Sequence, residues 1–493
     1  MAVVKDTFES RSPADDRVLA TFPVMNAEQV DEVVDFARIA ARWWSDLGWA
    51  ERRKRLLRFN AIMATRLDEL AELVHEENGK PTDDARLEII LAIEHTNWAA
   101  KNAERVLRRR RVMPGLLTLN QDARISYEPL GVVGVIGPWN YPVFTPIGSI
   151  SYALAAGNAV VLKPSEFTPA IGSWLVDAFG EAVPEQPVLQ LITGFGETGE
   201  SLCRSHVDKI SFTGSTPTGK RVMATCAETL TPVLLECGGK DAALVDHDAD
   251  LELAADVIAF GAFSNGGQTC VGVERVYVHE RVFNEFVAKL AAKAMALAPG
   301  VETDASYGPM TMPSQINVVR DHVRDAIERG ANAVIGGLDS IGNRLIGPVI
   351  LTNVPEDCSE IQDETFGPTV AVNPVRDLDE AVDRANASPF GLSASVFSSS
   401  RAALENAAAR LEVGMVSMNS WAMSAGVSAL PWGGVGQSGF GRLHGADGLR
   451  EFARTKSTVR EWFPIPVDLT TFKRSPRTAE VLGTIVKILY GRA

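Results

Sequence analysis

The sequence predicts an α/β fold with two α/β domains in series. The chain has 493 residues, of which 46% are apolar, so it can bury a large core and is long enough for two or three domains. After a helical start, short β-rich runs bounded by Gly and Pro alternate with helix-like stretches. Strands that alternate with helices indicate βα units and a parallel sheet.

The first part of the chain, up to about residue 100, is predicted to be mainly helical. Asn26 is suited to cap a first helix, because its side chain can accept a hydrogen bond from a free first-turn amide. Apolar residues then recur at helical spacing as far as Trp43 and Trp44. They are Val30, Val33, Val34, Ala37 and Ala41.

Two alternating series follow, and each is expected to form one domain. The first contains the β-rich runs "ISYEPLGVVGVIGPWN", "AVVLKPSE", "PVLQLITGFG", "KISFTGS" and "TPVLLECGGKDAALV", with helices expected over 170–182 and 217–229. The second runs from about 240 to 430, with helices near 280–297 and 314–330 and strands near 273–278, 369–375 and 392–397.

The charge of the chain argues against nucleic acid as a partner. The formal net charge is -14 and the pI is near 5.1, whereas phosphate binding depends on clustered Lys and Arg. The run Arg108 to Arg111 lacks interleaved aromatic residues, so we interpret it as a solvated surface.

The remaining composition indicates a cytoplasmic protein. The cysteines form no CxxC pair, which suits a reducing compartment; they are Cys203, Cys226, Cys237, Cys270 and Cys358. The N-terminus has no apolar signal segment, and no stretch reaches the ~20 apolar residues of an integral membrane span. No metal site is predicted, because the histidines show no ligand spacing with Cys or Asp.

Two stretches match the dinucleotide-binding pattern G-x-G-x-x-G. Gly194, Gly196 and Gly199 follow an apolar run, as a phosphate-binding turn after a strand requires. The acidic residue expected about 20 positions downstream is absent from a strand end, so both a phosphate site and a plain turn stay open. The second match has no long strand before it and is interpreted as a loop. Its glycines are Gly434, Gly436 and Gly439.

Several short stretches, taken in order, resemble the signatures of the NAD(P)-dependent aldehyde dehydrogenase superfamily. They are "PWNYP" (138–142), "KPSEFTP" (163–169), "FTGS" (212–215), "ECGGK" (236–240), "GGQTC" (266–270), "DETFGP" (363–368) and "PWGGVGQSGFGRLHG" (431–445). The resemblance covers nearly the whole chain and implies an aldehyde dehydrogenase-like fold that forms a homodimer or homotetramer. The domains implied are a discontinuous Rossmann-like NAD-binding domain over 1–117 and 131–236, a catalytic domain over 237–445, an oligomerisation hairpin and strand over 118–130 and 446–470, and a C-terminal tail over 471–493.

The resemblance also implies a covalent mechanism for aldehyde oxidation. Cys270 is expected to add to the carbonyl carbon as a thiolate, giving a thiohemiacetal and, after hydride transfer, a thioester. Asn140 and the backbone N–H of Cys270 are expected to stabilise the developing alkoxide. Glu236, at the end of an apolar strand, is expected to be the general base, with a pKa raised by desolvation. Cys237 stands where most relatives have Leu and is interpreted as packing.

Further residues are expected, by resemblance, to bind the cofactor NAD. Lys163 and Glu166 would hold the adenosine ribose, and Ser215 would meet the pyrophosphate at a helix N-terminus. Glu364 would hold the nicotinamide ribose, with Phe366 close to the ring. The other cofactor residues expected are Ile136, Trp139, Ser165, Gly196 and Gly214. An acid at position 166 would repel a 2′-phosphate, so NAD is favoured, with NADP as the alternative.

Other functions fit the sequence less well. A CoA-acylating dehydrogenase would share Cys270, but such relatives lack the acid at the position of Glu236. A non-catalytic structural or binding member would have no need of the intact Cys270, Glu236 and Asn140. A semialdehyde-specific dehydrogenase would carry an Arg, to pair with the distal carboxylate, where this chain has Gly148.

The missing Arg favours uncharged medium-chain or aromatic aldehydes as substrates. Tyr141, Phe144 and Trp421 are expected to line the pocket in its place. A cation from the loop near 415–430 would restore carboxylate binding.

The C-terminal stretch "AEVLGTIVKILYGRA" is predicted to be an amphipathic helix too short to span a bilayer. Lys487 and Arg492 lie near its apolar side, which is formed by Val481, Leu482, Ile485, Val486, Ile488 and Leu489. Docking onto the enzyme or a neighbouring subunit is favoured over peripheral contact with a membrane.

Overall fold

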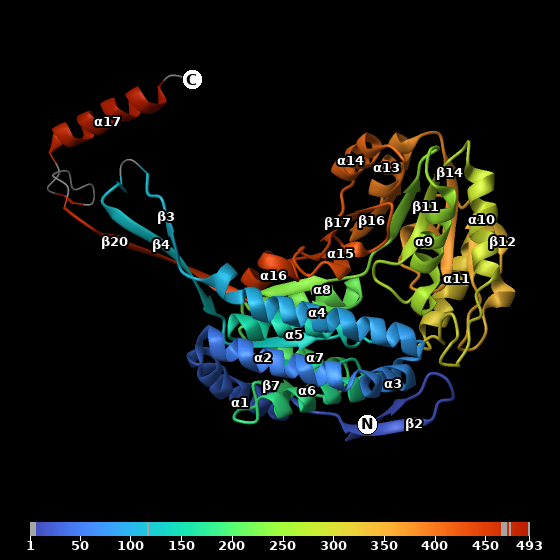
Figure 1. The fold of residues 1–493 in the computed structure, drawn as a ribbon, viewed down its shortest axis with the longest axis horizontal. Coiled ribbons are helices and arrows are strands. Elements are labelled where there is room, and N and C mark those ends of the chain that lie inside the picture. The colour runs from blue at the N-terminus through green and yellow to red at the C-terminus, as the bar shows by residue number, and fades with distance from the viewer. Residues whose placement is uncertain (1–5, 116–117, 465–470, 473–474, 492–493) are drawn as a thin grey trace. The chain divides into compact units, whose positions relative to one another are not determined.

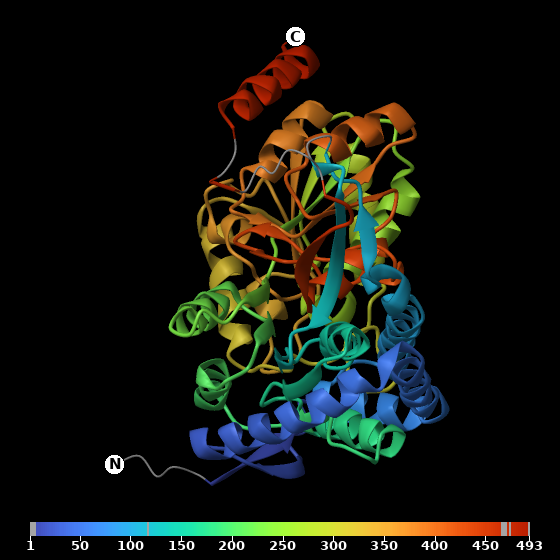
Figure 2. The same cartoon turned by 90° about the vertical axis from the view of Figure 1, so that its left-hand side faces the viewer.

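The computed structural model describes residues 6–115, 118–464, 471–472 and 475–491. The chain divides into two compact units, residues 1–107 with 129–454 and residues 108–128 with 455–493. Its path can be followed by colour in Figure 1 and, after a quarter turn, in Figure 2.

The first unit begins with a hairpin and a run of helices, which confirms the predicted helical start. The elements are β1 (Thr7–Arg11), β2 (Val18–Pro23), α1 (Ala27–Asp46), α2 (Gly48–Thr65), α3 (Leu67–Asn78) and α4 (Thr82–Leu107). Asn26 caps α1 as predicted. Its side chain accepts from the Gln29 amide, and the Gln29 side chain accepts from the Asn26 amide, each at 3.0 Å. This reciprocal pair satisfies amides that the helix leaves free.

A six-stranded sheet carries one half of the site. Its order is β19-β9-β8-β5-β6-β7, parallel except for the pair of β9 with β19. The strands are β5 (Val132–Ile136), β6 (Ala159–Lys163), β7 (Leu189–Leu191), β8 (Lys209–Thr213), β9 (Val233–Glu236) and β19 (Gly439–Phe440). The helices between them are α5 (Phe144–Ala156), α6 (Pro169–Ala182), α7 (Gly196–Arg204) and α8 (Thr216–Ala227). The direction of strand order reverses between β5 and β8, and ligands of such sheets bind beyond the strand ends at this point.

A seven-stranded sheet carries the other half. Its order is β12-β13-β14-β11-β10-β16-β17, and only the edge pair β12–β13 is antiparallel. The strands are β10 (Asp241–Val245), β11 (Val273–His279), β12 (Asn332–Ile335), β13 (Val349–Thr352), β14 (Thr369–Val375), β16 (Ser393–Phe397) and β17 (Met415–Met418). The helices include α9 (Leu251–Phe263), α10 (Phe283–Met295), α11 (Gln315–Glu328), α13 (Leu378–Asn386), α14 (Arg401–Arg410) and, near the end of the unit, α16 (Gly445–Glu451). Both series of predicted α/β elements are confirmed.

The core of the seven-stranded sheet fixes the position of the C-terminal end of α9. Ile258 and Phe263 of α9 are buried in one apolar cluster with Val276 and Val278 of β11. Because α9 runs into the "GGQTC" turn and β11 leaves it, this packing sets where the turn lies.

The second unit is a three-stranded sheet followed by a helix. The strands are β3 (Arg110–Val112), β4 (Gln121–Pro129) and β20 (Ala453–Glu461), in the order β20-β4-β3. Asp122 binds Arg111 at 2.9 Å and Arg124 at 2.7 Å, so part of the arginine run serves the sheet itself.

The predicted C-terminal helix is present as α17 (Pro476–Tyr490). Its apolar side chains Val481, Ile488 and Leu489 are 53%, 72% and 47% exposed. No helix in the described ranges has the length and apolar character needed to cross a bilayer.

Candidate active site

A cavity of about 1200 Å³ brings the predicted catalytic residues together. Cys270, Glu236 and Asn140 all line it, from the turn before β11, the end of β9 and the loop between β5 and α5. Five of the predicted cofactor residues line the same cavity: Trp139, Gly214, Ser215, Glu364 and Phe366.

Glu236 ends strand β9 where the sheet meets the cavity. It is 3% exposed, and its Oε1 has no hydrogen-bond partner among the described residues. Burial raises the pKa of Glu236 to about 8, and the charge of Arg442 opposes this rise only in part. The raised pKa agrees with the expectation from the apolar strand. A carboxyl with this pKa can take up and release a proton near neutral pH.

The residues before Cys270 form a left-handed turn. Asn265 has a φ of 52° and Gly267 a φ of 70°. A Cβ on Gly267 would lie 2.0 Å from the carbonyl oxygen of Gly367, so a side chain cannot be accommodated there. Gln268 closes the turn, because its Nε2 donates to the Asn265 carbonyl at 2.8 Å. The small and polar residues are therefore needed to turn the chain and deliver the thiol to the cavity.

The thiol of Cys270 is half-buried and surrounded by carboxyl groups. Burial raises the pKa of the Cys270 thiol, and Glu236, Asp241 and Glu364 raise it further through their charges. The thiol is therefore protonated at neutral pH, and a base is needed to form the nucleophilic thiolate.

Asn140 is fixed through both its backbone and its side chain. Its carbonyl oxygen accepts from Lys80 Nζ at 3.0 Å and from Asn265 Nδ2 at 3.1 Å. Its own Nδ2 donates to the Gln268 carbonyl at 3.0 Å. A side-chain amide nitrogen carries two hydrogens, so the second can donate to an oxygen in the cavity.

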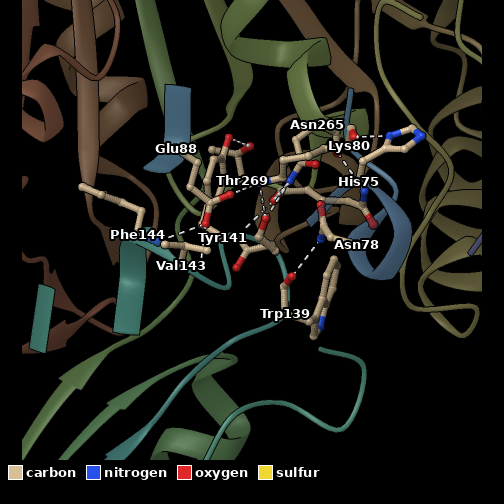
Figure 3. A network of polar contacts seen from close by, with 12 residues as sticks. His75, Asn78, Lys80, Glu88, Trp139, Tyr141, Val143, Phe144, Asn265 and Thr269 are labelled. Carbon is tan, nitrogen blue, oxygen red and sulfur yellow. Dashed lines mark hydrogen bonds and ion pairs between the residues drawn. The ribbon is translucent and has the colours of Figure 1, made fainter. Parts of the chain in front are cut away.

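A buried ion pair between Lys80 and Glu88 holds the loop that carries Asn140 (Figure 3). The two side chains are 1% and 0% exposed. Glu88 Oε1 accepts from the amides of Val143 at 2.7 Å and Phe144 at 3.0 Å, while the residue before α5 provides no side-chain cap. Glu88 therefore caps α5 from helix α4, and Lys80 holds the chain just before that cap.

The sequence motifs do not predict that Lys80, Glu88 and Gln268 position the catalytic residues. A signal for Glu88 was present, because it falls among the buried positions Ala85, Ile89 and Ala92 of α4. A carboxylate on the buried face of a helix is rarely unpaired, so its position predicts a buried cation nearby.

The strand ends at the point where strand order reverses suit a dinucleotide. Ile136 at the end of β5 lies beside Lys163 on β6 and Phe212 on β8. Helix α8 begins directly after Gly214 and Ser215, and Ser215 makes no side-chain cap hydrogen bond. The first-turn amides of α8 are thus suited to bind a phosphate.

Glu364 and Phe366 are held in place by a second buried ion pair, Lys240 with Glu274. Glu274 Oε1 accepts from the Phe366 amide at 2.9 Å. The Phe366 ring then packs edge-on against Trp139, with ring centroids 5.5 Å apart. Both predicted nicotinamide-side residues therefore lie on a braced loop.

The other predicted cofactor residues do not line the cavity: Ile136, Lys163, Ser165, Glu166 and Gly196. Lys163 Nζ donates to the Pro164 carbonyl at 3.0 Å, and burial lowers its pKa. Ser165 Oγ donates to Glu166 Oε2 at 3.3 Å. Gly196 is exposed at the start of α7. Their roles in cofactor binding stay predictions.

The glycines of the second G-x-G-x-x-G match allow two backbone segments to pack closely. Gly434 and Gly436 lead into β19, which pairs antiparallel with β9. A Cβ on Gly439 would lie 2.1 Å from the carbonyl oxygen of Leu235. These glycines permit a close approach to the strand that ends in Glu236.

The substrate side of the cavity is apolar and contains no free cation among the described lining residues. Tyr141, Phe144 and Trp421 line it as predicted. Lys80 is the one Lys or Arg in that lining, and it is paired with Glu88. The lining carboxyl groups are Asp84, Glu88, Glu236, Asp256, Asp363 and Glu364. The loop near 415–430 contributes residues to this lining without a cation, so it does not restore a carboxylate anchor.

Gly148, the position of the missing Arg, is buried against His444. A Cβ on Gly148 would lie 2.6 Å from His444 Nε2, so the imidazole fills the space that a side chain at 148 would need. His444 itself is 2% exposed, and burial lowers its pKa well below the usual range. The neutral imidazole of His444 thus occupies the space where a semialdehyde-specific dehydrogenase would carry a charged Arg.

Two further groups bear on the sequence predictions. Cys237 is buried and its thiol pKa is raised to about 12 by burial, which fits an inert packing residue. Asp246, His247 and His279 place one ligand atom each within 4.8 Å of one another, a grouping that sequence spacing did not indicate. The Asp246 carboxylate is already bonded to His247 Nδ1 at 2.8 Å.

Comparisons with known proteins show the family and the fold of the chain. The model of the family described as "Aldehyde dehydrogenase family" matches residues 2–458. A 4,4'-diapolycopene aldehyde oxidase from Methylomonas is 38% identical over 98% of this chain and 92% of its own length. The crystal structure of an NAD-dependent aldehyde dehydrogenase from Sinorhizobium meliloti is 32% identical, with a TM-score of 0.90 over 94% of this chain and 93% of that one. An indole-3-acetaldehyde dehydrogenase from P. syringae, solved as a mutant in complex with NAD+ and IAA, is 30% identical, with a TM-score of 0.88 over 93% and 94% of the two chains.

Proposed function

We propose that this chain, which belongs to the aldehyde dehydrogenase family, oxidises uncharged apolar aldehydes to carboxylic acids with NAD⁺ as the oxidant. One observation carries the proposal. A buried carboxyl with an unpartnered oxygen, a half-buried thiol and a side-chain amide converge on one cavity whose substrate side is apolar.

The proposed first step is addition of Cys270 to the aldehyde. Glu236 takes the thiol proton, the sulfur bonds to the carbonyl carbon, and the oxygen becomes an alkoxide. The free hydrogen on Asn140 Nδ2 and the backbone N–H of Cys270 stabilise that alkoxide. When bound, NAD⁺ supplies the two-electron acceptor that takes the hydride from this carbon, which leaves a thioester on Cys270.

The second step is hydrolysis of the thioester. Glu236 first releases the thiol proton to solvent and then takes a proton from a water molecule, whose hydroxide attacks the acyl carbon. The carbon–sulfur bond breaks to release the acid, and the departing thiolate takes the proton back from Glu236 to regenerate the thiol. The pKa of about 8 allows Glu236 to act as base in both steps. A CoA-acylating enzyme transfers its acyl group to a thiol instead and does not need this base.

The cofactor proposal rests on the strand ends and on α8. The uncapped N-terminus of α8 would hold the pyrophosphate, and Glu364 the nicotinamide ribose. Glu166 lies half-exposed just beyond β6. There its carboxylate would accept a hydrogen bond from a ribose hydroxyl, and its negative charge would repel a 2′-phosphate. NAD⁺ is therefore proposed over NADP⁺.

The test is a substrate panel with the purified full-length protein. We expect NAD⁺-dependent oxidation of hexanal and benzaldehyde, with a kcat/KM for hexanal at least tenfold above that for succinic semialdehyde. We also expect that added CoA does not change the rate. A higher kcat/KM for succinic semialdehyde, or turnover that requires CoA, would contradict the proposal.

A further inference from the structure

The mouth of the cavity carries an unusual set of exposed apolar side chains. Leu87 on α4, Leu253 and Phe260 on α9, and Met423 line the cavity, yet they are 50%, 42%, 50% and 58% exposed. We name these four residues the mouth collar. Exposed apolar side chains that cluster at a binding cavity indicate a ligand or partner that covers them.

The mouth collar is continuous with an inner ring of half-buried apolar residues. Leu91 lies one helical turn beyond Leu87, and Val257 lies between Leu253 and Phe260. From Leu253 to Phe260 helix α9 rises about 10 Å. Apart from Asp256, the residues of this stretch that line the cavity are apolar, and they extend further than an aldehyde of a few carbons would cover.

Direct contacts connect the mouth collar to the nucleophile. The exposed Phe260 ring packs edge-on against Trp421, with ring centroids 5.7 Å apart. The indole N–H of Trp421 donates to the Val271 carbonyl at 2.7 Å, and Val271 follows Cys270 in the chain. The apolar path thus runs from the surface to the residue next to the thiol.

We infer that the preferred aldehyde has a long, unbranched apolar tail that fills the inner ring and lies across the mouth collar. This inference deepens the proposed oxidation at Cys270 and rests on it. Each methylene that leaves water on binding contributes about fourfold to affinity when fully covered. The carboxyl groups Asp84 and Asp256 in the lining disfavour an anionic tail. The apolar side chains of the mouth collar favour an uncharged tail over a cationic one.

The experiment compares hexanal with decanal, each below its solubility limit in water. For the wild-type enzyme we expect kcat/KM for decanal to exceed that for hexanal by at least tenfold, mainly through KM. The variant Leu253→Ser/Phe260→Ser should lower this ratio to below threefold, because binding to the tail is lost while the chemistry is not. The control is Ile39→Ser on α1, which removes an exposed apolar side chain (63%) outside the cavity lining and should keep the wild-type ratio.

The outcomes separate this inference from the proposed function. Absence of hexanal oxidation by the wild-type enzyme would refute the proposed function itself. Hexanal oxidation with equal kcat/KM for decanal would overturn the inference alone. A double variant that changes the mass of the protein in solution but keeps the wild-type ratio would also overturn it, because the mouth collar would then be an interface between copies of the chain.

Discussion

Removing the charge of Lys80 should lower both the stability of the protein and kcat, for two different physical reasons. Lys80 and Glu88 are paired with their side chains 1% and 0% exposed, so Lys80→Met leaves a buried carboxylate without its counter-charge. Breaking a buried pair in this way costs about 3–5 kcal/mol in the free energy of unfolding. The same change removes one of the two hydrogen bonds to the Asn140 carbonyl, at 3.0 Å, so the side-chain amide is held less firmly by the remaining contacts with Asn265 and Gln268. A displacement of about 1 Å in such a group lowers kcat about 100-fold.

The double variant Lys80→Met/Glu88→Leu distinguishes the two effects. Replacing both charges by apolar groups should recover most of the lost stability, because no unpaired charge remains buried. It should not recover kcat, because the Asn140 carbonyl does not regain its bond from Lys80 and the first amides of α5 do not regain the Glu88 carboxylate. The assays are urea denaturation and kcat with hexanal.

A surface pair on the same helix provides the control. Arg86 contacts Asp68 at 2.9 Å with the two side chains 41% and 80% exposed, so Arg86→Met should cost at most about 1 kcal/mol and leave kcat unchanged. If Lys80→Met behaves like Arg86→Met in both assays, the ion pair does not position Asn140. If the double variant regains wild-type kcat, the pair serves stability alone.

Three other predictions concern Glu236, Gly267 and helix α17. The rate of thioester hydrolysis should rise with pH through about 8, because Glu236 must be ionised to act, and Glu236→Gln should lose this rise in single-turnover pH profiles; an unchanged profile would refute the base assignment. Gly267→Ala should lower the free energy of unfolding by more than ~1–2 kcal/mol, because its φ of 70° disfavours a side chain and a Cβ meets a backbone oxygen, whereas Gly180→Ala, with nothing within 4 Å, should be neutral or stabilising in the same denaturation assay; equal effects would show that the turn can relax. Deleting residues 476–493 should reduce the solution mass measured by light scattering or alter the kinetics, because it removes the apolar face of α17 that is expected to dock onto the enzyme or a neighbouring subunit. Unchanged mass and kinetics, with loss of liposome binding, would show instead that this face contacts a membrane.

Local patterns in the sequence predict the elements well. Asn26 and the helix after it follow from capping chemistry and helical spacing, and β11, β14 and β16 follow from short apolar runs between turn residues. The resemblance of the short motifs, in turn, predicts the three catalytic residues and five of the ten cofactor residues as residues that line the cavity.

Contacts between distant segments could not be predicted from those patterns. Lys80 and Glu88 act on a loop more than 50 positions away, and nothing in the local sequence links them to Asn140. His444 fills the space beside Gly148 from the other end of the chain. The exposure of the mouth collar is likewise set by tertiary packing, because a leucine on an amphipathic helix face looks the same in sequence whether it is covered or open.

The most direct measurement of the proposed chemistry is the intact mass of the Glu236→Gln protein after a single turnover with hexanal and NAD⁺. Glu236→Gln should slow both steps, but hydrolysis more than acylation, so the protein should gain the mass of one hexanoyl group, located on Cys270 by peptide mapping. The Cys270→Ala protein should gain nothing. An acyl group on another residue, or reduced cofactor formed by Cys270→Ala at the wild-type rate, would contradict the covalent mechanism.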